Sequence, residues 1–362
     1  MEGGYNNDYK NSNDNIDKEL EEILKKQSAR IKVVGIGGGG GNTATRMKET
    51  GIKGGEVIAI NTDAQDLLYT KADIKILIGR EISKGLGAGS NPAIGREAAR
   101  EQITEIKKRL ADSDLVFITC GMGGGTGTGA APVVAEVAKQ QGALVIGVVT
   151  LPFTCEGAKR IQNAQDGLER MQSLVDTLIV IPNDRLLDLA PNLPLPTAFK
   201  VADEVLTGAV KGITELITSS GLVNLDFADV KAIMGGGGVS LIGTGESDSN
   251  NRAVEAVDKA LNNPLLDVDI RNAKGALVNV VGGNDLSLEE YKEVVQMIGD
   301  KLNPDAKLIS GARIQQDMEN SLKVMVIITG VKSSQISGES VSVENAKLKD
   351  MEGELGINFF DE

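Results

Sequence analysis

The 362-residue sequence contains no histidine and no tryptophan, and its only cysteines are Cys120 and Cys155. Without histidine, a His-based catalytic triad, a histidine general base and a His-ligated metal site are all excluded. Two cysteines are too few for a zinc site or a disulfide framework, so we expect both to be small packing residues in a reducing cytoplasm. The chemistry of this chain must come from other residue types.

Positive charge and long apolar runs are also scarce. The 38 Lys and Arg residues face 51 Asp and Glu residues, which gives a formal net charge of −13. A surface this negative repels nucleic-acid phosphates and anionic lipids, so nucleic acid is not an expected partner. The longest apolar runs, such as residues 143–151, are well short of the ~20 residues that span a bilayer, and no secretory signal is recognisable. We therefore expect a cytoplasmic protein with no direct membrane insertion.

Glycine, in contrast, is abundant, with 44 residues in 362 against a typical ~7%. The glycines cluster in three loops at residues 35–42, 85–90 and 121–129. Bare backbone amides at the start of a helix favour anionic oxygens, so we expect these loops to surround a polyphosphate. The first loop contains a G-x-G-x-x-G pattern, but the strand after it ends in Asn61 rather than in an acidic residue that would hold a ribose. No Gly-Lys-Ser/Thr occurs, which excludes a P-loop enzyme.

Short apolar strands alternate with helices through the first half of the chain. The pattern predicts strands at residues 31–36, 57–60, 74–78, 115–119, 144–150 and 178–181, with helices at 94–110 and 132–141. A long amphipathic helix follows at residues 198–219. The second half alternates more, with strands at 239–245, 275–281, 306–314 and 321–330 and helices at 251–261 and 288–302. The fold class is α/β: a doubly wound, mostly parallel Rossmann-like sheet, a long central helix and a second, smaller α/β domain.

The segment Gly-Gly-Gly-Thr-Gly-Thr-Gly at residues 123–129 resembles the glycine-rich motif of the tubulin/FtsZ family. Flanking segments resemble FtsZ rather than tubulin; they lie at residues 37–42, 61–65, 87–92, 152–157, 181–184 and 221–229. They follow the family order over some 300 residues. The chain lacks the Pro-rich, basic-ended tail of bacterial FtsZ, so the archaeal type is the better match.

The resemblance implies a GTPase that assembles head to tail into filaments of the cell-division ring at midcell. It implies a division of the chain into an N-terminal extension with a short amphipathic helix (1–30), a GTP-binding domain (31–196), a central helix (197–221), a C-terminal α/β domain (222–331) and an acidic, flexible tail (332–362). We expect the homopolymer as the main partner, and membrane-tether or division proteins at the tail. The implied ligands are GTP or GDP and Mg²⁺. Mg²⁺ would bind to the GTP phosphates, and no residue is assigned as its protein ligand.

Residue by residue, the resemblance places a nucleotide on glycine loops and a few side chains. Glu156 and Arg160 would hold the ribose and the phosphate edge, although on their own they are more typical of an exposed i,i+4 ion pair. Asn183 would face sugar and base, Phe199 would stack on the base, and Asp203 would accept from guanine. The implied nucleotide-binding residues are Gly37, Gly38, Gly39, Gly40, Gly41, Asn42, Gly123, Gly124, Gly125, Thr126, Gly127, Thr128, Gly129, Glu156, Arg160, Asn183, Phe199 and Asp203.

No base for the attacking water is evident in the first domain. The implied catalytic residues are Asn224, Asp226 and Asp229, which start the second domain. Asp226 and Asp229 are spaced i,i+3 and would share one helix face; alone, they suit the positive end of a helix dipole. In the family such a segment enters the nucleotide pocket of the next subunit, and a contact of this kind builds a filament because it does not close on itself.

Two other functions remain open from the residues. The chain could be a GTP-binding regulator that does not polymerise, with the acidic pair purely structural. It could also be an NAD-dependent oxidoreductase, on the strength of its first glycine loop. The identity of copurified nucleotide separates NAD from guanine nucleotides, and light scattering on addition of GTP and Mg²⁺ separates a filament from a regulator.

Overall fold

The computed structural model describes residues 29–52, 54–185, 195–218, 222–223, 225–263, 270 and 273–331. The helix expected near residues 16–24 and the tail at 332–362 lie outside these residues. The strands are β1 (Ile31–Ile36), β2 (Gly55–Asn61), β3 (Ile74–Leu77), β4 (Leu115–Gly121), β5 (Leu144–Leu151), β6 (Thr177–Pro182), β7 (Gly238–Ser247), β8 (Gly275–Gly282), β9 (Lys307–Ile314) and β10 (Leu322–Thr329). The helices are α2 (Gly37–Thr50), α3 (Ala64–Tyr69), α4 (Pro92–Glu101), α5 (Ile103–Leu110), α6 (Thr126–Gln140), η1 (Thr154–Glu156), α7 (Ala158–Leu174), α9 (Leu195–Thr218), α10 (Phe227–Met234), α11 (Arg252–Leu261), α12 (Leu288–Gly299) and η4 (Gln316–Met318).

All the described strands belong to one sheet, in the order β3-β2-β1-β4-β5-β6-β7-β10-β8-β9. Neighbours from β3 to β6 are parallel, whereas β10 is antiparallel to both β7 and β8. The two halves meet where residues 177–179 of β6 pair with residues 238–240 of β7. The predicted α/β class with a mostly parallel first half is confirmed. The continuity of the sheet was not predicted, because three residue pairs leave no separate pattern in the sequence.

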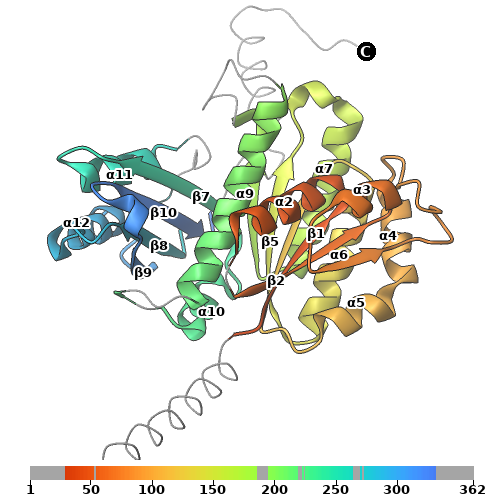
Figure 1. Cartoon of the computed structure of the whole chain (residues 1–362), viewed down its shortest axis with the longest axis horizontal. Coiled ribbons are helices and arrows are strands. Elements are labelled where there is room, and N and C mark those ends of the chain that lie inside the picture. Colours follow the sequence, from red (N-terminus) through yellow and green to blue (C-terminus); the bar gives the residue numbers. More distant parts are fainter. Residues whose placement is uncertain are drawn as a thin grey trace, which may run out of the picture.

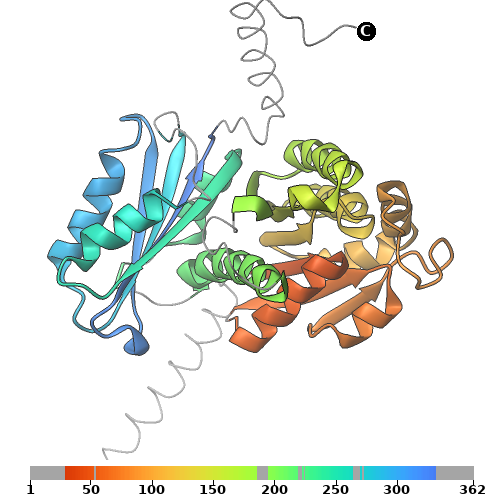
Figure 2. The ribbon, with the colours of Figure 1, turned by 90° about the horizontal axis from the view of Figure 1, so that it is seen from above.

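Three apolar clusters hold the layers together. One lies between the first-half strands and helices α4 to α7, and includes Ile118, Val134 and Met171. A second covers the opposite face with α2, α9 and α10, and it reaches the second half through Ile242 and Ile327. The third lies between β7, β8, β10 and helices α11 and α12. Helix α9 therefore packs against both halves, and Figures 1 and 2 show it between them.

Helix α9 forms the long strut that the sequence predicted. Its 24 residues extend about 36 Å at a rise of 1.5 Å per residue. Leu206, Ala209, Ile213 and Leu216, which belong to the predicted apolar stripe, are buried. The helix starts beside β6 and ends near α10, as the green ribbon in Figure 1 shows. Among the described helices, none is long and apolar enough to cross a bilayer.

Two helices of the first half differ from the prediction. The single helix expected at 94–110 is broken at Gln102, whose side chain accepts the Gly79 backbone N–H at 2.5 Å. Helix α6 begins at Thr126, inside the glycine loop, so Pro132 lies in its second turn rather than at its start. In the second half, Ser287 and Glu290 form a capping box at the start of α12, where the sequence predicted a helix from residue 288.

Candidate functional site

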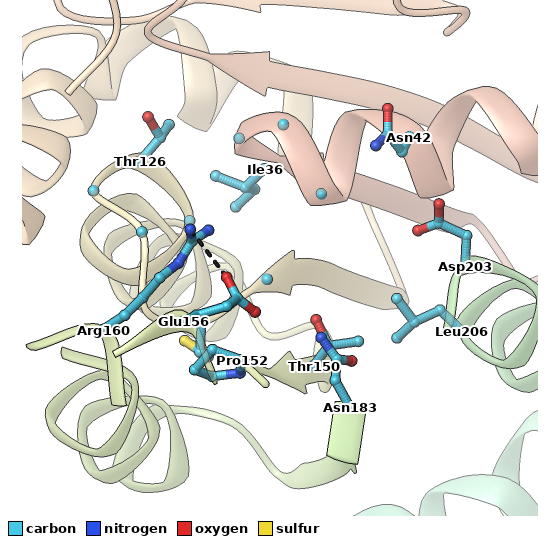
Figure 3. A pocket seen from close by; sticks show the side chains of 18 residues that line it. Ile36, Asn42, Thr126, Thr150, Pro152, Glu156, Arg160, Asn183, Asp203 and Leu206 are labelled. Atoms are coloured by element: carbon cyan, nitrogen blue, oxygen red, sulfur yellow. Dashed lines mark ion pairs between the residues drawn. The ribbon is translucent and has the colours of Figure 1, made fainter. Parts of the chain in front are cut away.

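A cavity of about 420 Å³ lies at the carboxyl ends of β1, β4, β5 and β6. It is bounded by the starts of α2 and α6, by η1 and α7, and by the third and fourth turns of α9 (Figure 3). Its lining residues are Ile36, Gly37, Gly38, Gly39, Asn42, Gly121, Met122, Gly124, Gly125, Thr126, Gly127, Thr150, Pro152, Glu156, Arg160, Asn183, Asp203 and Leu206. Twelve of these residues were expected from the sequence, and they come from five separate segments of the chain.

Two helices point uncapped N-termini at this cavity. Helix α2 follows Ile36 and helix α6 follows Gly125, and neither residue makes a side-chain capping hydrogen bond. Elsewhere, Asp63 caps α3 and Asn91 caps α4 through their side chains. The first backbone N–H groups of a helix need partners, and the helix dipole favours negative charge there. This wall of the cavity is therefore suited to an anion such as a phosphate group.

The glycines of the loops divide into those that line the cavity and those that allow close packing. A Cβ on Gly124 would meet nothing within 4 Å, whereas one on Gly129 would lie 2.1 Å from the Pro92 carbonyl oxygen. Likewise a Cβ on Gly40 would lie 2.5 Å from the Thr119 carbonyl oxygen. Of the expected binding residues whose side chains the structure describes, five are not among those that line the cavity: Gly40, Gly41, Gly123, Thr128 and Gly129.

The third glycine loop, at residues 85–90, was expected to surround the ligand, but it does not line the cavity. It lies beneath the wall instead, since a Cβ on Gly125 would come within 2.7 Å of the Ala88 side chain. The buried Thr128 hydroxyl accepts the Gly123 backbone N–H at 2.8 Å and so fixes the turn before α6. The Thr126 hydroxyl lies 2.6 Å from that of Thr62, which orients it beside the cavity.

Glu156 and Arg160 form the expected pair, with Arg160 Nη1 3.0 Å from Glu156 Oε2. The dashed line in Figure 3 marks this contact. Glu156 is held further because its Oε1 accepts the Phe153 backbone N–H at 2.8 Å. Asp184 accepts the Thr154 backbone N–H at 3.0 Å and so fixes the short helix that carries Glu156. Glu156 is thus held against the cavity by its own segment, while the Arg160 side chain is half exposed.

Asp203 and Asn42 lie at one end of the cavity, while Thr126 and Arg160 lie toward the other (Figure 3). Asn42 was expected beside the phosphates, together with the glycines of the first loop, but its side chain lies at the same end of the cavity as Asp203 (Figure 3). Burial raises the pKa of Asp203 to about 6, against the lowering effect of a hydrogen bond from Thr43 and of the Arg46 charge. Asn183 is buried and its Oδ1 has no hydrogen-bond partner. A buried acceptor without a partner costs stability, which a ligand donor in the cavity would relieve.

The expected catalytic residues are placed far from this cavity. Asp226 precedes α10 as its N-cap and Asp229 is the third residue of that helix, beyond the opposite end of α9. The sequence predicted only that Asp226 and Asp229 share one helix face. In the structure, each carboxylate also accepts a hydrogen bond from the backbone N–H of the other residue. Asn224 and the side chain of Phe199 lie outside the described residues, so their expected roles stay predictions.

Six lining residues were not among the implied binding residues, although the first four lie in predicted glycine loops or family segments: Ile36, Gly121, Met122, Pro152, Thr150 and Leu206. All but Leu206 lie at or just after the carboxyl ends of β1, β4 and β5, which could have pointed to them, whereas Leu206 lies in the middle of α9. Cys120 is fully buried, and burial raises the pKa of its thiol to about 12. Cys155 is free and exposed in η1, so the expectation that both cysteines are packing residues is wrong for this one. Among the described residues, no three acidic or cysteine side chains gather in a way that could hold a metal ion.

Comparison with known proteins accords with this geometry. The tubulin/FtsZ family GTPase domain matches residues 30–191, and the FtsZ family C-terminal domain matches residues 238–332. Cell division protein FtsZ 1 of Methanocaldococcus jannaschii is 60% identical over 317 residues, which cover 88% of this chain and 87% of the relative. Cell division protein FtsZ of Methanothermobacter thermautotrophicus is 53% identical over 342 residues, which cover 94% and 90%.

Solved structures agree with the sequence matches. An empty FtsZ dimer from M. jannaschii superposes with a TM-score of 0.83 at 60% identity, and the match covers 87% of this chain and 92% of that one. Both halves of the chain, and the helix between them, are thus accounted for by one protein family. The chain therefore belongs to the tubulin/FtsZ family of GTPases, and within that family it is an FtsZ of the archaeal type.

Proposed function

We propose that this chain is a cell-division GTPase whose filament completes the hydrolytic site, with Asp226 and Asp229 of one copy acting on the nucleotide of the next. Family membership supports GTP hydrolysis and cell division. The finer statements concern where the nucleotide lies, which residues act on it, and what the assembly contributes.

The nucleotide would lie along the cavity with its phosphates against the starts of α2 and α6. The uncapped N–H groups and the glycines Gly38, Gly39 and Gly124 leave room for anionic oxygens. The ribose would contact the Glu156–Arg160 pair, and guanine would reach Asp203. An ionised carboxylate accepts from both the ring N–H and the amino group of guanine, a pattern that adenine does not offer.

Mg²⁺ would enter with the triphosphate. Among the described residues, two carboxylates line the cavity, Glu156 and Asp203, and neither is grouped with other acidic ligands. Mg²⁺ keeps several waters and is bound in most phosphate-transfer sites by one or two carboxylates and the substrate's own phosphates. When bound, it would neutralise charge on the phosphates, while the residues of this chain orient the nucleotide.

The observation that carries the shared site is the occupation of both cavity carboxylates. Glu156 is paired with Arg160, and Asp203 lies at the end away from Thr126 and Arg160 (Figure 3). Neither is placed to orient water at the terminal phosphate. Asp226 and Asp229 lie beyond the far end of α9, so one copy cannot bring them to its own cavity without unfolding, whereas a head-to-tail neighbour can.

The remaining organisation follows from the same proposal. We infer a GTP-binding domain at residues 31–196, a central helix at 197–221 and a C-terminal domain at 222–331, flanked by the extension 1–30 and the tail 332–362. The tail would bind membrane-tether or division proteins, because Phe359 and Phe360 offer an apolar anchor in an acidic segment. The filament would act in the cytoplasm at the midcell ring.

The test is GTP turnover per molecule against protein concentration. A shared site gives turnover near zero at low concentration and a rise above a threshold at which light scattering also appears. Turnover per molecule that stays constant down to dilutions without any oligomer would contradict the proposal, and would favour a GTP-binding regulator with a complete site of its own.

A mixing experiment identifies the residues. Asp226→Asn leaves the cavity intact, while Gly124→Asp places a carboxylate among the expected phosphate positions at a point where a Cβ meets nothing. Each variant should be nearly inactive alone, and a mixture should recover part of the turnover. Gly124→Asn, a neutral residue of the same size, controls for bulk at this position. No recovery in mixtures that still co-assemble would refute the assignment of Asp226.

A further inference from the structure

Thr43 of α2 and Asp203 of α9 meet at the base end of the cavity. Thr43 is fully buried, and its hydroxyl lies 3.3 Å from Asp203 Oδ1 and 3.1 Å from the Gly39 carbonyl oxygen. A hydroxyl donates one proton at a time, and a carboxylate is a stronger acceptor than a carbonyl. Among the described residues, Thr43 is the only one whose side chain donates a hydrogen bond to Asp203.

The charges around Asp203 make this contact matter. Arg46 of α2 and Glu204 of α9 are the charged groups that face it, and they form an ion pair with each other. Asn42 and Asn183, which line the same cavity, are uncharged. Burial favours a proton on Asp203, and a protonated carboxyl cannot accept from both guanine donors. The Thr43 hydroxyl acts against that proton and fixes one oxygen of the carboxylate.

We propose that Thr43 is a positioning residue for base recognition, holding the Asp203 carboxylate ionised and oriented toward guanine. This inference rests on the proposed function, because it assumes that Asp203 reads the base. Helix α2 would then serve both ends of the nucleotide, with its glycine start at the phosphates and Thr43 in its second turn behind the base-reading residue.

The same helix provides a matched control. The Thr45 hydroxyl donates to the Gly41 carbonyl oxygen at 2.9 Å, just as that of Thr43 lies near the Gly39 carbonyl. Thr45 also accepts the Lys71 backbone N–H at 3.0 Å and is not among the residues that line the cavity. Thr45→Val therefore removes a helix hydroxyl without touching Asp203, whereas Thr43→Val removes the one that reaches it.

The experiment measures dissociation constants of GDP and of inosine diphosphate from pH 5.5 to 8.5. The two ligands carry the same phosphates, so phosphate titration cancels in the ratio of their affinities, and inosine lacks only the amino group. In the unmodified protein the preference for GDP should fall as the pH drops through about 6. In Thr43→Val the midpoint should move up by about half to one pH unit, and GDP should bind about three- to tenfold more weakly at pH 6.5.

Thr43→Ser should restore the unmodified profile, and Thr45→Val should leave it unchanged. If Thr43→Val is not folded by circular dichroism, Thr43→Ala serves the same comparison. An unmoved midpoint in the Thr43 variants, together with loss of the GDP preference in Asp203→Asn, would overturn the role of Thr43 and leave the proposed function standing. An unchanged preference in Asp203→Asn would instead show that Asp203 does not read the base, and both statements would fall.

Discussion

Asp226 and Asp229 cap the start of α10 reciprocally. Asp226 Oδ1 accepts the backbone N–H of Asp229 at 2.8 Å, and Asp229 Oδ2 accepts that of Asp226 at 3.2 Å. Each carboxylate therefore uses one oxygen on its own helix, and under the proposed function the other oxygen would act on the neighbouring molecule. The two residues combine a structural role within the chain with the catalytic role proposed between chains, and a substitution must separate the two.

The first prediction makes that separation with asparagine. Asparagine caps helices as well as aspartate does, so Asp226→Asn should keep the stability of α10 while it loses the charge. GTP turnover should fall by about 10²- to 10⁴-fold, which is typical for loss of a group that assists proton transfer. Nucleotide affinity should be unchanged, as measured by fluorescent GDP titration.

Asp226→Ala is the companion variant. It loses both the charge and the cap, so its free energy of unfolding should also fall by about 1 kcal/mol in denaturant titrations. Equal turnover in Asp226→Asn and the unmodified protein would mean that the residue is only a cap.

A second prediction concerns the choice of base. Guanine offers two donors to a carboxylate, whereas xanthine offers one donor and one acceptor, which matches the amide of asparagine. Asp203→Asn should bind GTP more weakly by about 1.5–3 kcal/mol, the range for a hydrogen bond to a charged group, and should gain affinity for XTP. Competition binding with both nucleotides measures this, and an unaltered GTP-to-XTP ratio would show that the carboxylate does not read the base.

A third prediction separates the two kinds of glycine. A Cβ at Gly129 would lie 2.1 Å from the Pro92 carbonyl oxygen, so Gly129→Ala must push α6 away from α4 and should destabilise the fold by a few kcal/mol. Gly124→Ala meets open space and should unfold like the unmodified protein, but bind GTP more weakly because the methyl group occupies the expected phosphate position. Thermal unfolding and GTP titration of both variants test this, and reversed effects would contradict it.

A fourth prediction concerns the ion pairs that Arg252 forms with Asp285 and Glu290 in the second half. Arg252, which is buried, lies 2.6 Å from Asp285 Oδ2 and 2.7 Å from Glu290 Oε1. Its hydrogen bond to Glu290 is the main cause that lowers the pKa of that carboxyl to about 2. A lowered carboxyl pKa contributes stability above pH ~4.5, and this contribution is lost as the pH falls toward 2.

Arg252→Gln should therefore lower the free energy of unfolding at pH 7, because Asp285 and Glu290 lose their cationic partner while Ser287 still donates to Glu290. The difference from the unmodified protein should shrink as the pH falls from 4.5 to 2, as seen in urea unfolding at several pH values. A difference in unfolding free energy that stays constant over this pH range would show that Arg252 stabilises the protein through packing rather than charge.

A fifth prediction places the end of the folded unit. Val331 is buried, and its backbone N–H donates to the Val239 carbonyl oxygen at 3.3 Å. Truncation after Val331 should leave GTP-dependent polymerisation intact, while truncation before it should lower the melting temperature. Polymerisation is measured by light scattering on addition of GTP and Mg²⁺. Loss of polymerisation in the variant that ends at Val331 would show that the tail takes part in assembly.

The sequence by itself determined the layered α/β class, the long helix α9 and the helix start at Ser287, because each depends on local periodicity or local capping. It also indicated the eight expected lining residues that belong to the glycine loops, since glycine-rich turns after buried strands have few other uses. The family resemblance, rather than spacing, supplied Asp203 and the pair Asp226 and Asp229.

Only the tertiary structure decided which glycines line the cavity and which merely allow helices to pack, because Gly124 and Gly129 differ only in what lies opposite their missing side chains. The same holds for the junction of β6 with β7 and for the contact between Thr43 and Asp203, which are 160 residues apart. Such contacts leave no periodic pattern, because they depend on how separate elements are brought together rather than on the residues within any one of them.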